Sequence, residues 1–336
     1  MGKPIQMTDS TSEAFIIVGG AGFIGSHFID HLLGNSKTRK VTIYDNFTSG
    51  QAWHYAHHKS DKRLVVVNAN VHDLERLSAT MPGHDTCILL AANPDIAAAV
   101  NDPDIDFREG TMLTRNVLEA MRTSDCKQLL YASGSGVYGD VGDRELSEDH
   151  GGGAPISTYG ASKLACEALI SAYCHMFEFT ARCFRFANVI GPRQTHGVGY
   201  DFLRKLRDDP TKLEILGDGS QSKSYIYVKD TIAAVLCAHA NETKSFQVYN
   251  AATGDDITVT EIADLVVDVL GLDKNNVEYV YSGGDRGWKG DVPVIRLNSD
   301  RIRALGWVCK NSTREAMRKS LVALVEDLNN APASDA

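Results

Sequence analysis

Tyr159 and Lys163, in the segment TYGASK, have the types and spacing that could move a proton. They stand four positions apart in the helix predicted over 157–176, so their side chains share one helical face. A phenol acts as a base near neutral pH only when its pKa falls from about 10, and a neighbouring ammonium group favours that fall. The pair therefore predicts acid–base catalysis, and the alternative is an ordinary solvated helix face.

A second chemical motif is the glycine series Gly19, Gly22 and Gly25, which follows an apolar segment at 14–18 and leads into a helical pattern. A bare backbone at such a turn lets a pyrophosphate lie on the helix N-terminus. Asp45 stands about 20 residues further on, where a carboxylate accepts hydrogen bonds from a ribose diol and repels a 2′-phosphate. The pattern predicts NAD rather than NADP, and the alternative is a plain strand–helix turn.

The order of apolar and amphipathic segments predicts the scaffold that positions these residues. Buried strands are predicted at 14–18, 40–44, 64–67, 86–92, 127–133 and 181–190, and helices at 22–33, 105–122 and 157–176. Strands rich in Val, Ile and Leu without alternation are typical of a parallel sheet covered on both faces. Alternating strands and helices then predict a doubly wound α/β fold of the Rossmann type.

The alternation loosens after Gly191 and Pro192, which suggests a second, smaller α/β portion. Strand-like pieces at 213–217 and 224–228 mix there with helices near 230–240, 260–270 and 311–328. We predict four segments: a disordered lead-in at 1–12, an NAD-binding domain at 13–190, a portion for the second ligand at 191–330, and a tail at 331–336. Residues 220–240 could return to the first domain.

Composition excludes several classes of partner. The 336-residue chain is 43% hydrophobic and 23% charged, and its net charge of −9 is scattered, which disfavours nucleic acid and anionic membranes. No apolar run approaches the ~20 residues of a membrane span, and residues 1–12 lack the apolar core of a secretory signal. Seven cysteines without a CxxC motif predict reduced thiols in the cytoplasm.

Further motifs, taken in order, resemble a known family. These are GGAGFIGSH, LAAN, SGSGVYGD, PISTYGASK, FANVIGPR and GDRGWKGDVP, spread over residues 14 to 326. Together with Asp45 they resemble the extended short-chain dehydrogenase/reductases, and within these the NAD-dependent nucleotide-sugar epimerases of the UDP-galactose 4-epimerase type. The resemblance implies NAD as cofactor, a UDP-sugar as substrate, and a homodimer formed through helices 105–122 and 157–176.

The resemblance also implies which residues line the two binding sites. For the cofactor they are Gly19, Gly22, Phe23, Ile24, Gly25, Asp45, Asn46, Ser49, Gly50, Asn70, Val71, Leu90, Ala91, Ala92, Ser133, Tyr159, Lys163 and Phe186. For the substrate they are Gly134, Ser135, Tyr159, Asn188, Val198, Leu216, Lys223, Arg286 and Asp291. Among these, Asn188 and Lys223 match residues that contact the diphosphate, and Leu216 matches a residue beside the uracil.

The loop after the strand at 127–133 departs from the family pattern. Relatives place a Ser or Thr three residues before the Val of this loop, where it bonds the sugar hydroxyl, but counting back from Val137 gives Gly134. Ser133 or Ser135 could supply the donor, and we favour Ser135. Alternatively, the glycine makes room for substrate and the tyrosine works alone. Outright loss of such a donor could cost on the order of 10²–10³ in rate.

The same loop discriminates between reactions. Relatives that eliminate water or decarboxylate carry acidic residues where this chain has Ser135 and Gly136. Elimination needs an added acid or base, so the resemblance favours redox-neutral epimerisation.

Other positions also differ from the family. Gly110 replaces an Asn near the cofactor, and Asn70 replaces the Asp of the adenine-contacting pair. Ile295 replaces a bulky Tyr that restricts the sugar 2-substituent, so an acetamido sugar could fit. Arg193 and His196 could line the same cleft.

Near the C-terminus, Trp288 stands where relatives have a phosphate-binding Arg. Arg286 or Lys289 could take over that role, and Asp291 could hold the ribose.

The segment WHYAHH raises the question of a metal. His54, His57 and His58 share one face of a predicted helix, so two of them could bind an ion. The sequence offers no acidic or cysteine partner near them, and the proposed chemistry needs no metal. We therefore predict no metal site.

Together these features favour reversible epimerisation at C4 of a UDP-hexose. The resemblance implies that Tyr159 takes the C4 hydroxyl proton while hydride passes to NAD⁺, and that the transient 4-keto sugar turns over before hydride returns. Lys163 can also hold the nicotinamide ribose. The alternatives are an epimerase or dehydrogenase for a UDP-uronic acid or UDP-N-acetylhexosamine, and a non-catalytic NAD-binding sensor.

Overall fold

The computed structural model describes residues 13–150, 154–284, 286, 290 and 292–330. The lead-in predicted at 1–12 and the tail predicted at 331–336 lie outside these residues.

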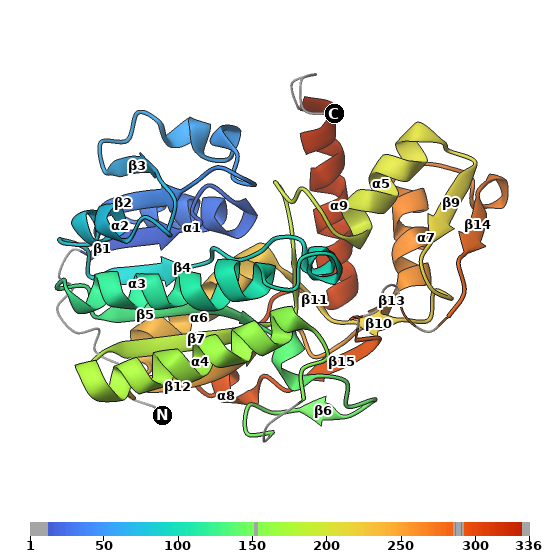
Figure 1. Cartoon of the computed structure of the whole chain (residues 1–336). Helices are drawn as coiled ribbons and strands as arrows, with labels where there is room; N and C mark the ends of the chain where they lie inside the picture. Colours follow the sequence, from blue (N-terminus) through green and yellow to red (C-terminus); the bar gives the residue numbers. More distant parts are fainter. Residues whose placement is uncertain (1–12, 151–153, 285, 287–289, 291, 331–336) are drawn as a thin grey trace, which may run out of the picture.

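A seven-stranded sheet forms the centre of the molecule, in the order β12-β7-β5-β4-β1-β2-β3, with every neighbouring pair parallel (Figure 1). Its strands are β1 (Glu13–Val18), β2 (Thr38–Asp45), β3 (Leu64–Asn68), β4 (Thr86–Leu89), β5 (Gln128–Gly134), β7 (Thr180–Phe186) and β12 (Phe246–Ala251). The predicted doubly wound fold is confirmed. The chain runs outward from β1 in one direction and from β4 in the other, so the ligand crevice of such a sheet falls between these two strands.

Helices cover both faces of the sheet. The helices α1 (Phe23–Gly34) and α6 (Val228–Asn241) lie on one face, and α2 (Leu74–Thr80), α3 (Leu113–Arg122) and α4 (Thr158–Phe177) lie on the other. Consecutive residues of β1 pack on opposite faces of the sheet. Ile17 belongs to the hydrophobic core beneath α1, and Ile16 belongs to the core beneath α3 and α4. Because both faces are buried, the strand shows no polar alternation.

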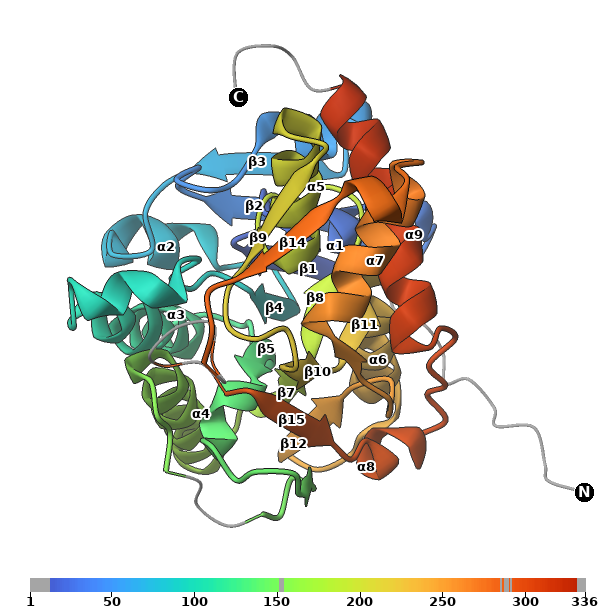
Figure 2. The ribbon, with the colours of Figure 1, turned by 90° about the vertical axis from the view of Figure 1, so that its right-hand side faces the viewer.

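The C-terminal portion, which faces the viewer in Figure 2, has an apolar core of its own. It is built from α5 (Val198–Asp208), β9 (Lys212–Ile215), α7 (Val259–Val269), β14 (Glu278–Tyr281) and α9 (Thr313–Asn330). Small sheets join it to the rest through β6 (Glu145–Leu146), β8 (Asn188–Ile190), β10 (Ser222–Lys223), β11 (Tyr225–Tyr227), β13 (Ile257–Thr258) and β15 (Val294–Leu297). Short helical turns are η1 (Ala52–His58), η2 (Ile96–Val100), η4 (Ser135–Tyr138), η5 (Lys274–Asn276) and α8 (Asp300–Arg303).

Several elements differ from the sequence-based expectation. The strand predicted at 181–190 divides into β7 and β8, because β8 leaves the large sheet to pair with β11. The helix predicted at 105–122 begins with a π-helix, η3 (Phe107–Met112). Strand β12 was not predicted, since it forms the sheet edge and its first half is only partly buried.

Among the described residues, none of the helices combines the length and apolar character needed to cross a membrane.

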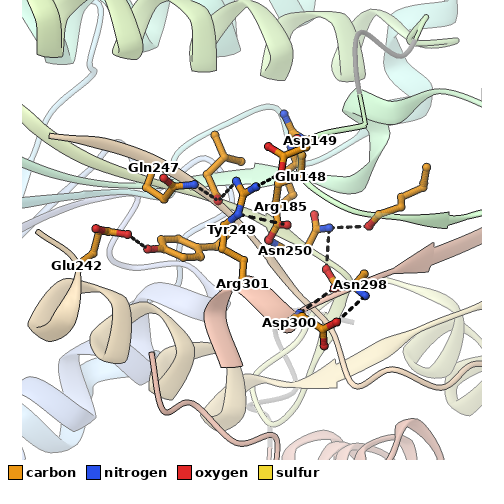
Figure 3. Close-up of polar contacts among 12 residues, drawn as sticks. Glu148, Asp149, Arg185, Glu242, Gln247, Tyr249, Asn250, Asn298, Asp300 and Arg301 are labelled. Atoms are coloured by element: carbon orange, nitrogen blue, oxygen red, sulfur yellow. Dashed lines mark hydrogen bonds and ion pairs between the residues drawn. The ribbon is translucent and has the colours of Figure 1, made fainter. Parts of the chain in front are cut away.

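Asn250 is a buried junction between β12 and two loops (Figure 3). Its Nδ2 donates hydrogen bonds to the carbonyls of Leu146 and Asn298, at 2.8 and 2.9 Å. Its backbone N–H donates to Glu148 at 2.7 Å, and its Oδ1 accepts a hydrogen bond from the Tyr138 hydroxyl at 2.7 Å. This one side chain therefore ties the edge of the sheet to the loop that follows β5.

We predict that Asn250→Ala lowers the free energy of unfolding by about 3 kcal/mol, because it leaves several buried polar groups without partners. Urea denaturation followed by circular dichroism measures this loss. Asn241→Ala, at an exposed position, is the control and should change stability by less than about 1 kcal/mol. Equal losses in the two variants would contradict the role of Asn250.

Candidate active site

The glycine-rich turn joins β1 to α1 at the centre of the sheet. Gly22 caps α1 without any side-chain hydrogen bond, so the first-turn N–H groups are available to an anion. Gly19 has φ +84°, and a Cβ there would lie 2.6 Å from the backbone nitrogen of Ala91. Likewise, a Cβ at Gly25 would lie 2.6 Å from the carbonyl oxygen of Gly20. These contacts explain the glycines and place the turn against the residues that follow β4.

Asp45 ends β2 beside this turn. Its two carboxylate oxygens accept hydrogen bonds from the backbone N–H groups of Ala21, at 2.9 Å, and Phe47, at 2.8 Å. Burial raises the pKa of Asp45, although these two hydrogen bonds act in the opposite direction. A carboxylate fixed next to an uncapped helix N-terminus fits the ribose and pyrophosphate of a dinucleotide.

The other residues predicted for the cofactor lie along the same edge of the sheet. Asn46, Ser49 and Gly50 follow β2, Asn70 and Val71 follow β3, Leu90, Ala91 and Ala92 follow β4, Phe186 ends β7, and Phe23 and Ile24 open α1. Parallel strands all end on one side, so residues far apart in sequence meet there.

The tyrosine–lysine pair lies at the start of α4, whose N-cap Ser157 accepts a hydrogen bond from the Gly160 N–H at 3.1 Å. Lys163 is buried, and its Nζ donates a hydrogen bond to the carbonyl of Ala132 at 2.7 Å. The same nitrogen lies 5.5 Å from the centre of the Tyr159 ring. The ammonium group therefore lies beside the phenol and at the end of β5.

The loop after β5 lies next to the phenol. A Cβ at Gly134 would meet only Tyr159 Cε1, at 3.9 Å, so the glycine leaves open space there. The Ser133 hydroxyl donates a hydrogen bond to Glu167 Oε1 at 2.6 Å. Its single proton is therefore already used in that bond. The Ser135 hydroxyl has no hydrogen-bond partner among the described residues. Of the two flanking serines, Ser135 is thus the one with a proton free for a ligand.

Two charged residues that the sequence analysis missed form an ion pair beneath this loop. Arg185 of β7 donates to the carboxylate of Glu167 of α4 at 2.7 and 3.0 Å, and both side chains are at most 10% exposed. Burial by itself disfavours the charged guanidinium, but the hydrogen bonds and charge of Glu167 outweigh it and raise the pKa of Arg185. Glu167 follows Tyr159 and Lys163 at helical spacing, and that spacing could have revealed it.

The register of the sheet extends this polar layer. Ser133, Arg185 and Asn250 are aligned partners on the adjacent strands β5, β7 and β12. The Arg185 guanidinium also lies 4.7 Å from the centre of the Tyr138 ring. The loop that carries Gly134 is therefore held on both sides by buried polar contacts.

Asp106 is another buried acid that no local pattern indicated. Its carboxylate accepts hydrogen bonds from Asn93 at 2.9 Å and from the hydroxyl of Thr158, the residue before Tyr159, at 2.6 Å. The Ser162 hydroxyl donates to the Asp106 carbonyl at 2.7 Å, and a Cβ at Gly110 would lie 2.3 Å from this hydroxyl. The glycine that replaces the family's Asn is therefore explained by close packing against α4.

The predicted substrate residues come from the small joining sheets and from the C-terminal portion. Asn188 lies in β8 and donates a hydrogen bond to the Ser224 carbonyl at 3.3 Å. Lys223 of β10 is aligned with Ile295 of β15. Leu216 follows β9 and is 61% exposed.

Two further substrate positions are described and three lie outside the described residues. Val198 opens α5, and Arg286 forms an ion pair with Asp140 at 2.6 Å, beyond the loop after β5. The residues outside the described part of the chain are Trp288, Lys289 and Asp291.

The histidine segment does not match its predicted arrangement. His54 is buried, its Nδ1 lies 2.8 Å from the Ala21 carbonyl, and it does not belong to the group of ligand atoms formed by His57, His58 and Asp30. His57 and His58 instead contact Asp30 of α1, which also binds the Arg193 guanidinium at 2.6 Å. The prediction that no acidic partner lies near was wrong, because Asp30 is brought in from a separate helix.

This combination of a doubly wound sheet, a glycine-rich turn, a buried acid after β2 and a tyrosine–lysine helix defines the class of extended short-chain dehydrogenase/reductases. The chain belongs to the NAD-dependent epimerase/dehydratase family, whose sequence profile matches residues 15–252. It is therefore an enzyme, and its cofactor is NAD.

Individual relatives are similar over nearly the whole chain. A putative UDP-glucose 4-epimerase of Methanocaldococcus jannaschii is 30% identical over 311 residues, which cover 90% of this chain and 96% of that protein. A crystal structure of a UDP-galactose 4-epimerase has a TM-score of 0.83 at 33% identity, over 94% of this chain and 99% of that one. The Thermotoga maritima UDP-glucose 4-epimerase, crystallised with UDP-glucose, has the same TM-score and coverage at 28% identity.

We predict that Arg185→Gln lowers the free energy of unfolding by about 3–5 kcal/mol, since it leaves the buried Glu167 carboxylate without its cation. Arg39→Gln is a matched control, because Arg39 pairs with Asp85 at 3.2 Å with both side chains about half exposed. The control should lose less than about 1 kcal/mol. Chemical denaturation of both variants provides the comparison, and a small loss for Arg185→Gln would refute the importance of the pair.

Proposed function

We propose that this protein interconverts UDP-hexoses that differ in configuration at C4. The observation that carries the proposal is the placement of Tyr159 and Lys163 beside the open space at Gly134, on the edge of the sheet that holds the cofactor residues. The relatives described above, which include UDP-glucose and UDP-galactose 4-epimerases, support the substrate class.

Bound NAD would accept a hydride from the sugar and later return it. The Tyr159 hydroxyl is the group that would exchange a proton with the C4 oxygen, because it borders the space next to the loop after β5. Lys163 is fixed by the Ala132 carbonyl, so its positive charge stays beside the phenol. The free Ser135 hydroxyl would donate a hydrogen bond to the same sugar oxygen, in the place of the hydroxyl that Gly134 lacks.

The contact between α4 and the loop supports epimerisation over dehydration. A Cβ at Gly160 would lie 2.4 Å from the Gly136 carbonyl oxygen, so the first turn of α4 packs directly on the loop. Gly136 at this contact and the preceding Ser135 carry no carboxyl group that could serve as the extra acid or base of an elimination.

A second candidate is a UDP-N-acetylhexosamine. Ile295 of β15 is paired with Lys223 of β10. Ile295 would face the sugar 2-substituent, and Lys223 is the residue predicted to contact the diphosphate, so the two predicted contacts lie side by side. Turnover of UDP-N-acetylglucosamine at least equal to that of UDP-glucose would favour this substrate. A non-catalytic NAD sensor is the less supported alternative, because Tyr159 and Lys163 are both in place.

Homodimer formation also belongs to the proposal. The segment leading into α3 exposes Phe107 and Met112, at 56% and 43%, on the side predicted to pair with a second copy. Sedimentation equilibrium distinguishes a dimer from a monomer.

We predict that the purified protein, without added NAD, converts UDP-galactose to UDP-glucose. Following the sugar protons by NMR would reveal the product directly, and conversion requires NAD that remains bound from expression. A new methyl signal would instead indicate dehydration and overturn the interpretation of the loop. No change with either UDP-galactose or UDP-N-acetylgalactosamine, in protein shown to contain NAD, would contradict the proposed activity.

We predict that Tyr159→Phe reduces turnover by about 10²-fold or more, because it removes the proton-transferring hydroxyl. The variant should retain NAD, since the cofactor residues beside the glycine-rich turn are unchanged. Turnover by NMR and cofactor content by absorbance after denaturation are the two measurements. Unchanged turnover would refute the assigned role of Tyr159.

A further inference from the structure

Three potential metal ligands converge beside α1, outside the candidate active site. His57 and His58 end η1, and their Nε2 atoms lie 2.7 and 2.8 Å from the same oxygen, Oδ1 of Asp30. One ligand atom from each residue can be chosen so that all three lie within 4.8 Å of one another. The three side chains thus converge on one position although they come from two separate elements.

The cluster is both accessible and oriented. The side chains of His57, His58 and Asp30 are 49%, 21% and 30% exposed, so an ion can reach them from solvent. The Arg193 guanidinium lies 2.6 Å from the other carboxylate oxygen of Asp30, Oδ2. Arg193 therefore keeps Asp30 charged and leaves Oδ1 facing the two imidazoles.

We propose that Asp30, His57 and His58 bind a divalent transition-metal ion of the zinc type, with water completing the coordination. Imidazole nitrogen and carboxylate oxygen are ordinary zinc ligands. A tetrahedral ion with bonds of about 2.1 Å separates its ligand atoms by roughly 3.4 Å. Each imidazole nitrogen must then move about 0.7 Å away from Asp30 Oδ1. The two rings can make this movement because they are partly exposed and lie at the end of a short helix.

The charges around the cluster determine which ions can bind. Arg193 is positive, and its guanidinium lies 2.6 Å from Asp30 Oδ2, so the surroundings oppose a cation held by electrostatics alone. Bonds to the imidazole nitrogens must supply the affinity. This requirement favours Zn²⁺ over Mg²⁺, because Mg²⁺ prefers oxygen ligands.

The site would also support the glycine-rich turn. At the start of η1, the backbone N–H of its N-cap Gln51 donates a hydrogen bond to the Ala21 carbonyl at 3.0 Å, and His54 Nδ1 lies 2.8 Å from the same oxygen. An ion bound by His57, His58 and Asp30 would join the other end of η1 to α1, the helix that the turn opens. We therefore expect Zn²⁺ to raise the thermal unfolding midpoint of the protein.

Calorimetric titration of the full-length protein with ZnCl₂ tests the proposal. We expect one equivalent of Zn²⁺ to bind, MgCl₂ to give no binding, and His57→Gln or His58→Gln to weaken zinc binding by about tenfold or more. His72→Gln is the matched control, because His72 pairs with Glu109 at 3.1 Å as a single partly exposed imidazole. This control should leave the zinc affinity unchanged.

Two results would overturn the proposal. One is no zinc binding by the unmodified protein, and the other is zinc binding that persists unchanged when both His57 and His58 are replaced by Gln. Co²⁺ absorption spectra provide a further check, since a thiolate charge-transfer band would assign the ion to a cysteine. Such a band would also rule out the proposed site.

Discussion

The buried ion pair between Glu167 and Arg185 is the constraint on which the candidate active site depends. Removing two charges from water is costly, and their mutual attraction offsets this only when geometry and additional hydrogen bonds are good. Here the hydrogen bonds are of 2.7 and 3.0 Å, with Ser133 as a further donor. Because the pair tolerates little displacement, α4 is held at one position against β5 and β7. That position sets where Tyr159 and Lys163 meet the loop.

A second constraint acts from the centre of the sheet. Parallel strands place all their carboxyl ends on one side, and the order of strands reverses between β1 and β4. The turn at Gly19 fits against Ala91 only without a side chain, and the uncapped start of α1 then faces the same edge. The predicted cofactor residues and the helix that carries Tyr159 and Lys163 consequently share one side of the molecule, although they are spread over much of the sequence.

The fold and the glycine-rich turn could be predicted because their signals are local. Apolar strands without alternating polar residues predicted burial on both faces of the sheet, and the glycines together with Asp45 predicted a dinucleotide-binding turn. Asp106 and Asp30 could not be found in the same way, since their partners lie far along the chain. Asp106 meets Thr158 across 52 positions, and Asp30 meets His57 across 27. The edge strand β12 was not predicted because half of it is only partly buried, so its sequence lacks a clear run of apolar residues.

The sequence by itself determined the fold class, the position of the glycine-rich turn, and the pairing of Tyr159 with Lys163 on one helical face. These follow from spacing within a strand, a turn or a helix, where backbone geometry fixes which residues are neighbours. Only the tertiary structure decided that the Ser133 hydroxyl donates its proton to Glu167, that Gly134 leaves open space beside Tyr159, and that Asp30 contacts two histidines. Each of these depends on which strands and helices pack together, and that is settled by burial over the whole chain rather than by any short segment.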